Sequence, residues 1–135
     1  MKRRTFFTAG AIALALPATA HAAGLVEYQP GAVEKALAEG KTVLVEYSAT
    51  WCSTCKRQER VINTLRGTDT AYEANIKFIK VDWDTYRRHP VTTDRRIPRR
   101  STLILLRGND ELGRIVAGTS QSQIKSLMDL GLPGA

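Results

Sequence analysis

Two cysteines three residues apart are the side chains best suited to chemistry in this chain. They lie in the run Trp51-Cys52-Ser53-Thr54-Cys55-Lys56, and no other cysteine is present. An apolar run, Val43 to Val45, precedes them and a stretch of helical periodicity follows, so we expect both at the start of a helix. The unpaired N–H groups and partial positive charge of a helix start favour a thiolate at Cys52, the candidate nucleophile. Cys55, about one turn further on, is the candidate resolving thiol that releases a mixed disulfide.

A close cysteine pair can also form a structural disulfide, bind zinc, attach haem or bind copper. A structural disulfide across so short a loop gains little by restricting the unfolded chain. A closed zinc site needs four ligands, and beyond the N-terminal segment described below only Cys52, Cys55 and His89 offer a thiolate or an imidazole. Covalent haem attachment requires a histidine where this chain has Lys56. Two thiolates can bind Cu(I), so a copper-binding role stays an alternative to a redox-active pair that needs no cofactor.

The first 22 residues have the composition of an export signal. A basic start, Met1 to Arg4, is followed by an apolar stretch from 6 to 16 and by small residues suited to cleavage near Ala22. The apolar stretch is shorter than the roughly 20 residues of a membrane span. Arg3 and Arg4 also resemble a twin-arginine signal, so the export route stays open. We expect a cleaved signal peptide over 1–22, a domain over 23–135, and a periplasmic location in which disulfides persist.

Length and charge restrict the function classes. The chain of 135 residues is long enough for one domain with a hydrophobic core. Its net charge of +7 falls to about +4 when the three basic residues at positions 2–4 are removed. This mild excess, with no RNA- or DNA-binding motif in the sequence, predicts no nucleic-acid partner.

The hydrophobic pattern predicts alternating strands and helices. We expect strands at 25–28, 42–48, 76–82, 101–107 and 113–117, and helices at 30–38, 52–65, 84–89 and 120–130, with a possible helical turn near Tyr72. Gly67 and Pro90 are expected to end helices. This order predicts an α/β fold with a mixed sheet layered by helices.

From about Leu25 to Leu130 the chain resembles the thioredoxin family. The resemblance is carried by the W-C-x-x-C-K motif at 51–56, by Ile97-Pro98, by Glu46 and by Gly118, in this order and spacing. It implies the thioredoxin fold, a central mixed β-sheet flanked by helices. Within the family, the Cys-x-x-Cys-Lys ending without an internal proline is most similar to periplasmic reductase-type domains such as the C-terminal domain of DsbD.

The resemblance also implies roles for residues around the pair. Pro98 is expected in a cis peptide bond beside the dithiol, so that the backbone of Ile97 could pair with an extended client peptide. Glu46 is expected to be a buried acid with a raised pKa that exchanges a proton with Cys55. Trp51 is expected to shield the sulfurs and to form part of the client-binding surface.

The chain departs from the family pattern near the predicted site. Ser53-Thr54 replaces the Gly-Pro of cytosolic thioredoxins, Glu46 replaces the usual Asp, and Arg99-Arg100 follows Pro98 where the family usually has Thr. Six arginines and one acid occupy positions 87–100. This run is either a solvated face or a rim that attracts acidic partners.

Together these features predict a periplasmic thiol-disulfide oxidoreductase that works in the reducing direction. The expected partners are client proteins that contain disulfides and a membrane thiol donor that re-reduces the pair. The protein itself is expected to be a monomer.

Overall fold

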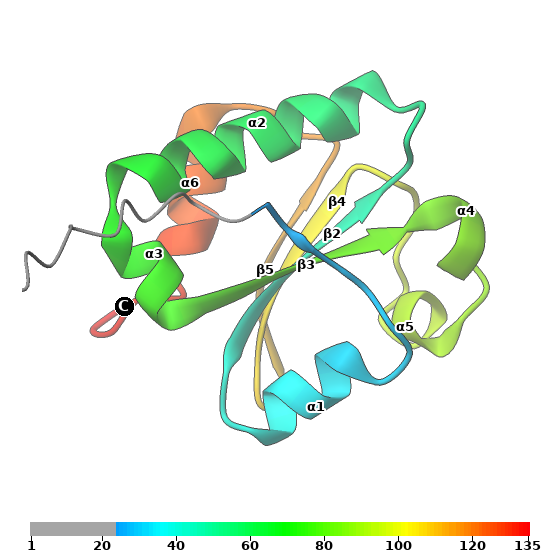
Figure 1. The fold of residues 1–135 in the computed structure, drawn as a ribbon, viewed down its shortest axis with the longest axis horizontal. Coiled ribbons are helices and arrows are strands. Elements are labelled where there is room, and N and C mark those ends of the chain that lie inside the picture. Colours follow the sequence, from blue (N-terminus) through cyan, green and yellow to red (C-terminus); the bar gives the residue numbers. More distant parts are fainter. Residues whose placement is uncertain (1–23) are drawn as a thin grey trace, which may run out of the picture.

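The computed structural model describes residues 24–135, and the predicted export signal lies outside them. The strands form one sheet in the order β1-β3-β2-β4-β5 (Figure 1). Strands β1, β3 and β2 are parallel, whereas β4 pairs with β2 and β5 with β4 in antiparallel fashion. Their bounds are β1 (Val26–Glu27), β2 (Thr42–Ser48), β3 (Ile76–Asp82), β4 (Thr102–Arg107) and β5 (Asp110–Val116).

Helices cover both faces of this sheet. On one face lie α2 (Ser53–Thr68), α3 (Thr70–Asn75) and α6 (Gln121–Asp129). The other face is covered by α1 (Ala32–Ala38) and two short helices, α4 (Trp83–Tyr86) and α5 (Pro90–Thr93). The predicted α/β architecture, a mixed sheet flanked by helices, is confirmed.

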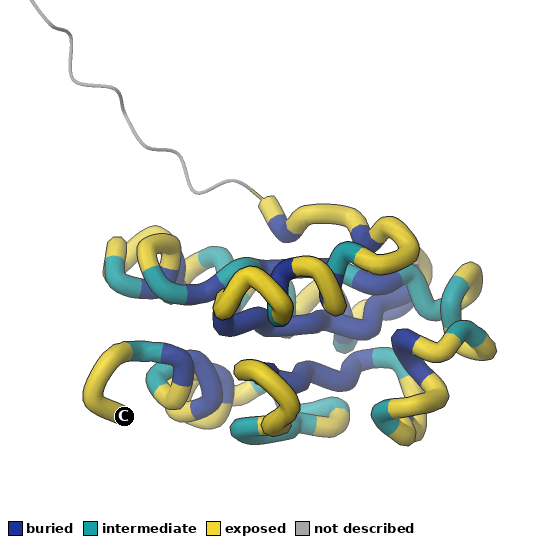
Figure 2. Tube along the Cα trace, turned by 90° about the horizontal axis from the view of Figure 1, so that it is seen from below, coloured by how far each residue is buried: buried dark blue, intermediate teal, exposed yellow. Residues whose placement is uncertain are grey.

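Side-chain alternation along the central strand divides the core in two. Every residue of β2 is buried, as expected for a strand covered on both faces. Leu44 faces the α2 and α6 side, whereas Val43 and Val45 face the α1 side. Figure 2 shows the buried stretches in the interior and the exposed ones on the outer turns of the helices and loops. By the same alternation Glu46 lies on the face of Leu44, beneath the helix that begins beside the cysteines.

Two predicted helix ends were wrong. Helix α2 continues through Gly67 to Thr68, and Asp69 then begins α3 by accepting the N–H of Ala71 at 2.9 Å. Pro90 begins α5 instead of ending the preceding helix. A proline is tolerated at the first helical position because its fixed φ suits the first turn and its missing N–H would have no partner there.

Helix α2, with 16 residues, is the longest helix between residues 24 and 135. None of the helices in that range combines the length and apolar character that crossing a membrane requires.

Candidate active site

The two cysteines lie at the N-terminus of α2, directly after the central strand β2. Cys52 is the N-cap residue, and its Sγ accepts the backbone N–H of Cys55 at 3.1 Å. The N–H of Cys52 is donated to the carbonyl of Ala49 at 3.1 Å, which fixes the loop between β2 and α2. The two sulfurs are joined in a disulfide. The predicted position of the pair at a helix start is therefore present, with a backbone N–H directed at the sulfur of Cys52.

The two sulfurs differ in access to solvent. Cys52 is 4% exposed and Cys55 is fully buried, and both pack against Ala49 and the partly buried Trp83. An incoming disulfide can therefore reach Cys52 first, while Cys55 is placed to attack from behind. The predicted roles, Cys52 as nucleophile and Cys55 as resolving thiol, stay predictions.

Trp51 forms an exposed rim beside the cysteines. Its side chain is 58% exposed, and its Nε1–H donates to Oδ2 of Asp84 at 2.8 Å. The guanidinium carbon of Arg100 lies 4.3 Å from the centroid of the Trp51 ring, a cation–π contact. The indole is thus held between an acid and a base and presents an apolar surface to solvent next to Cys52.

Glu46 is buried in the middle of β2. It has no solvent exposure, and neither of its carboxylate oxygens has a hydrogen-bond partner within residues 24–135. Burial, with a smaller effect from the negative charge of Glu59, raises the pKa of Glu46 to about 8, although Lys80 opposes the rise. The predicted burial and raised pKa of this acid are present.

A partly buried ion cluster lies on the same face as Glu46. Lys80, its register partner on β3, contacts Glu59 on α2 at 3.3 Å and Glu27 on β1 at 3.4 Å. These side chains line a cavity of about 540 Å³ that also contacts Ala49 and Lys56 beside the pair.

The prediction of a cis proline beside the dithiol was wrong. No peptide bond between residues 24 and 135 is cis, and Pro98 is exposed. Strand β4 begins only at Thr102, so three further residues separate Pro98 from the strand. The residue directly before the strand is Ser101, and its Oγ lies 3.1 Å from the sulfurs of both Cys52 and Cys55.

Ile97 also takes a different place from the predicted one. Its side chain is buried in the core on the α1 side, and its N–H is donated to the carbonyl of Thr92 at 3.2 Å. Because this N–H already has an internal partner, it is not available to pair with a client peptide in this structure.

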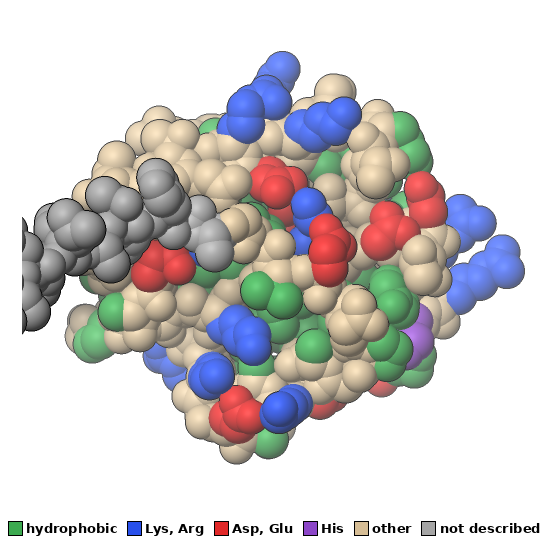
Figure 3. Space-filling view, viewed as in Figure 1, with side chains coloured by type: hydrophobic (Ala, Val, Ile, Leu, Met, Phe, Trp, Pro, Cys, Tyr) green, Lys and Arg blue, Asp and Glu red, His purple; other side chains and the backbone are tan. Residues whose placement is uncertain are grey.

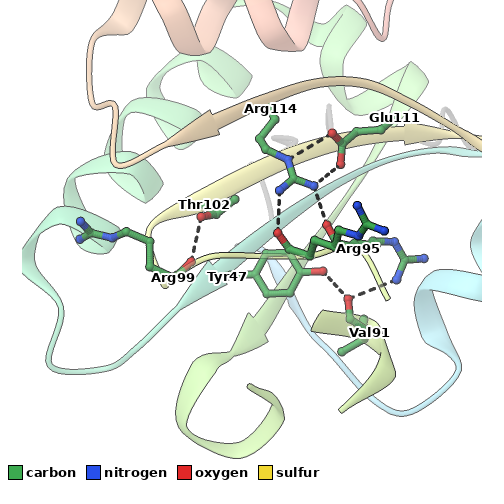
Figure 4. Close-up of polar contacts among 8 residues, drawn as sticks. Tyr47, Val91, Arg95, Arg99, Thr102, Glu111 and Arg114 are labelled. Carbon is green, nitrogen blue, oxygen red and sulfur yellow. Dashed lines mark hydrogen bonds and ion pairs between the residues drawn. The ribbon is translucent and has the colours of Figure 1, made fainter. Parts of the chain in front are cut away.

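Side chains of β4 and β5 hold the basic segment around Pro98 against the sheet by hydrogen bonds to its backbone (Figure 4). Arg114 of β5 donates to the carbonyls of Arg95 at 2.7 Å and Arg96 at 3.0 Å. The hydroxyl of Thr102 donates to the carbonyl of Arg99 at 2.8 Å. The segment from 95 to 102 is therefore positioned by hydrogen bonds at both of its ends.

Sequence reasoning missed Ser101 and Gln58 as site residues. The amide of Gln58 on α2 donates to the carbonyls of Ser101 at 2.9 Å and Gly118 at 2.8 Å, and so connects the helix to two loops. The one sequence signal for Ser101 is its position directly before the apolar strand β4, which pairs with the strand that leads to the cysteines. Gln58 has no comparable signal, since a polar residue in an amphipathic helix normally faces solvent.

The fold and the cysteine pair define a class of protein: a single α/β domain that carries a Cys-x-x-Cys disulfide at the N-terminus of a helix beside a mixed sheet. Residues 25–130 match the thioredoxin family, and the chain belongs to that family.

Individual relatives agree with this assignment. Thioredoxin H2-1 of Oryza sativa subsp. japonica is 33% identical over 90 residues, which cover 67% of this chain and 61% of that protein, so the chain spans about three fifths of this relative's length. The crystal structure of Trxlp from Edwardsiella tarda EIB202 aligns with a TM-score of 0.65 and 35% identity, covering 79% of this chain and 98% of that one. A Malassezia sympodialis thioredoxin aligns with a TM-score of 0.68 at 19% identity over 84% of this chain and 97% of that one, a likeness of fold.

Proposed function

We propose that this protein is an exported thiol-disulfide oxidoreductase that reduces disulfides in client proteins. The observation that carries the proposal is the disulfide between Cys52 and Cys55 at the start of α2, with the sulfur of Cys52 accepting a helix N–H. A sulfur in that position is stabilised as a thiolate once the pair is reduced.

The reaction proceeds in two exchanges. The Cys52 thiolate attacks one sulfur of a client disulfide, forms a mixed disulfide and releases the other client sulfur as a thiolate, which takes a proton from water. Cys55 then loses its proton and attacks the Cys52 sulfur, which releases the second client thiolate. The client gains two electrons and two protons, and the pair becomes the disulfide.

Glu46 is proposed to accept, in its ionised form, the proton that Cys55 loses. A carboxyl group with a pKa of about 8 can both hold and release a proton near neutral pH. Its place on the α2 face of the sheet puts it on the same side as Cys55. The charges of Glu59 and Lys80 act on Glu46, and these two side chains line the cavity that is proposed as the route of the proton toward solvent.

The reducing direction and the location are proposed from the sequence. The export signal over 1–22 would deliver the domain to the periplasm, as for the DsbD-like domains it resembles. A reductase there must be re-reduced, so a membrane thiol donor is the proposed second partner, and the working form is proposed to be a monomer. A reduction potential nearer the ≈ −270 mV of thioredoxin than the ≈ −120 mV of DsbA would support the reducing direction, and the reverse would contradict it.

The clients are proposed to present acidic surface near their disulfides. Arg99 is exposed, and Arg100 stacks on Trp51 at the rim of the site. The Nε of Arg100 is buried and has no hydrogen-bond partner among the described residues. Figure 3 shows further basic side chains projecting from the edge that carries α4 and α5. A carboxylate of a client would find a charge partner there in the guanidinium groups of Arg99 and Arg100.

Copper binding remains the alternative function for the same sulfurs. Within residues 24–135 no three side chains of His, Cys, Asp or Glu are grouped so that they could hold a metal ion, so no specific observation favours it. Metal analysis of protein purified under reducing conditions separates the two functions: one Cu(I) per chain would favour copper handling.

Reduction of insulin disulfides by the purified domain, with dithiothreitol as electron source, tests the proposal. Wild-type protein should accelerate reduction, and Cys52→Ser should abolish the effect. Cys55→Ser should accumulate a mixed disulfide with the client, visible on a non-reducing gel, because the resolving thiol is missing. A wild-type rate no higher than that of dithiothreitol alone would overturn the proposed activity.

A further inference from the structure

A buried hydroxyl group lies between the two redox sulfurs. The Oγ of Ser101 is 3.1 Å from the Sγ of Cys52 and 3.1 Å from the Sγ of Cys55, and Ser101 has no solvent exposure. Within the described part of the chain, these sulfurs are the only hydrogen-bond partners of the hydroxyl. A buried hydroxyl normally requires a partner, so its satisfaction depends on the redox pair itself.

The backbone of Ser101 is fixed by hydrogen bonds to strand β2, to helix α2 and to the loop after β5. Its N–H donates to the carbonyl of Tyr47 in β2 at 2.7 Å, and its carbonyl accepts from Gln58 of α2 at 2.9 Å and from the N–H of Ala117 at 2.8 Å. Its φ of 61° lies in the left-handed region, which serine adopts only where the surroundings require it. The hydroxyl therefore sits at a set distance from the sulfurs and retains only rotation about its own bonds.

The loop that leads to Ser101 is anchored as well. Arg114 donates to the carbonyl of Arg95, and Thr102 donates to that of Arg99, as Figure 4 shows. Arg114 also donates to the carbonyl of Arg96. Residues before and after Ser101 in the sequence therefore make hydrogen bonds that fix the position of its hydroxyl.

We propose that Ser101 is a catalytic residue whose hydroxyl serves both sulfurs in turn. A serine hydroxyl has one donor hydrogen and two acceptor lone pairs. In the reduced protein it would donate to the Cys52 thiolate and accept from the Cys55 S–H. This arrangement adds a side-chain donor to the backbone N–H of Cys55 and lowers the pKa of Cys52 further than the helix start alone.

The same hydroxyl has a second use later in the reaction. In the mixed disulfide, Cys52 carries no charge, and Cys55 must become the thiolate. Rotation of the Ser101 O–H toward Cys55 would then stabilise the new negative charge without any backbone movement. No external oxidant or reductant enters this step, since only a hydrogen bond changes partner.

The simpler interpretation is that Ser101 only fills a small space beside the disulfide. On that interpretation Ser101→Ala, which keeps the three backbone hydrogen bonds, would leave sulfur chemistry unchanged. The two interpretations therefore differ in their effect on the pKa of Cys52.

The test measures that pKa directly. In a Cys55→Ala background, which isolates the nucleophile, the rate of alkylation by iodoacetamide is followed as a function of pH with and without Ser101→Ala. Loss of the donor should raise the pKa of Cys52 by roughly one unit, so that alkylation slows by about tenfold well below the pKa and is unchanged well above it.

A matched control uses a buried hydroxyl away from the sulfurs. Thr92→Val removes a hydroxyl that donates to the carbonyl of Tyr86 at 2.8 Å, so the pKa of Cys52 should stay the same. Ser101→Gly, which tolerates the positive φ, should reproduce the shift of Ser101→Ala if the alanine variant folds poorly.

The intact pair provides a second readout. Loss of a donor to the thiolate destabilises the reduced form, so Ser101→Ala should make the pair more reducing by up to tenfold in equilibrium constant, about 30 mV. An unchanged pKa of Cys52 in both Ser101 variants, or an equal shift in Thr92→Val, would overturn the proposal. Only the catalytic role of Ser101 rests on the proposed function; its effect on the pKa of Cys52 does not. Alkylation needs no client protein. A protein that failed to reduce insulin could therefore still show the shift in the pKa of Cys52, and a protein that reduced insulin could show no such shift.

Discussion

The buried carboxyl group of Glu46 predicts an unusual dependence of stability on pH. The pKa of Glu46 rises from its ordinary value of 4.5 to about 8 in the folded chain. Between these two values the folded chain holds a proton that the unfolded chain has released. The free energy of unfolding must therefore decrease as pH increases through that window, which is the opposite of a carboxylate held in an ion pair.

The magnitude follows from the same pair of values. The rise from 4.5 to about 8 is about 3.5 pKa units. At about 1.4 kcal/mol for each unit it corresponds to roughly 5 kcal/mol between pH 4.5 and 8, a large share of the 5–15 kcal/mol typical of a domain. Glu46→Gln, which is neutral at every pH, should remove most of this slope and be more stable than wild type near pH 8.

Urea unfolding at several pH values between 5 and 8 measures the effect. The protein should be kept in the disulfide form, since reduced cysteines titrate in the same range. Glu39→Gln is a suitable control: Glu39 is exposed, and Lys41 lowers its pKa, so its titration lies below the window. A wild-type free energy that stays flat from pH 5 to 8, or a slope that survives in Glu46→Gln, would refute the reasoning.

Two further predictions concern the rim and its support. Changing Arg99 and Arg100 to Ser should slow reduction of acidic disulfide peptides several-fold relative to basic ones, mainly at low salt, since exposed charges act through steering. The same loss of charge at Lys35 and Lys41, at the opposite end of β2, should leave the rate ratio unchanged, and equal ratios in both double variants would remove the acidic-client proposal. Gln58→Leu removes the side-chain donor of the Gly118 carbonyl and one of the two donors of the Ser101 carbonyl, so urea unfolding should show a loss of roughly 2 kcal/mol. An unaltered midpoint would mean that those hydrogen bonds contribute little.

The local pattern of the chain was sufficient for much of the fold. The continuous apolar run of β2, the alternation in β3 and the periodicity of α2 and α6 each report burial of neighbouring residues on one or two faces. Such patterns depend on residues close in sequence, and they predicted the layered sheet. The helix ends at Gly67 and Pro90 were less predictable, because glycine and proline are compatible with more than one position at a helix end.

The chemistry of the cysteine pair was likewise determined by sequence. Cys52 and Cys55 are separated by less than one helical turn, so their spacing alone brings the sulfurs together. Burial of Glu46 could also be predicted, because it interrupts an apolar run that must be covered on both faces.

The surroundings of the pair were decided only by tertiary structure. Ser101 meets Cys52 across 49 positions and Cys55 across 46, and this approach depends on how the loop after Pro98 joins β4. The Ile97-Pro98 motif predicted that the proline would lie beside the sulfurs. Three further residues separate Pro98 from β4, and the last of them, Ser101, lies beside the sulfurs instead. Contacts between residues so distant in sequence are set by loop length and strand register, which leave no periodic signal, and for that reason the hydroxyl between the sulfurs became visible only in the folded chain.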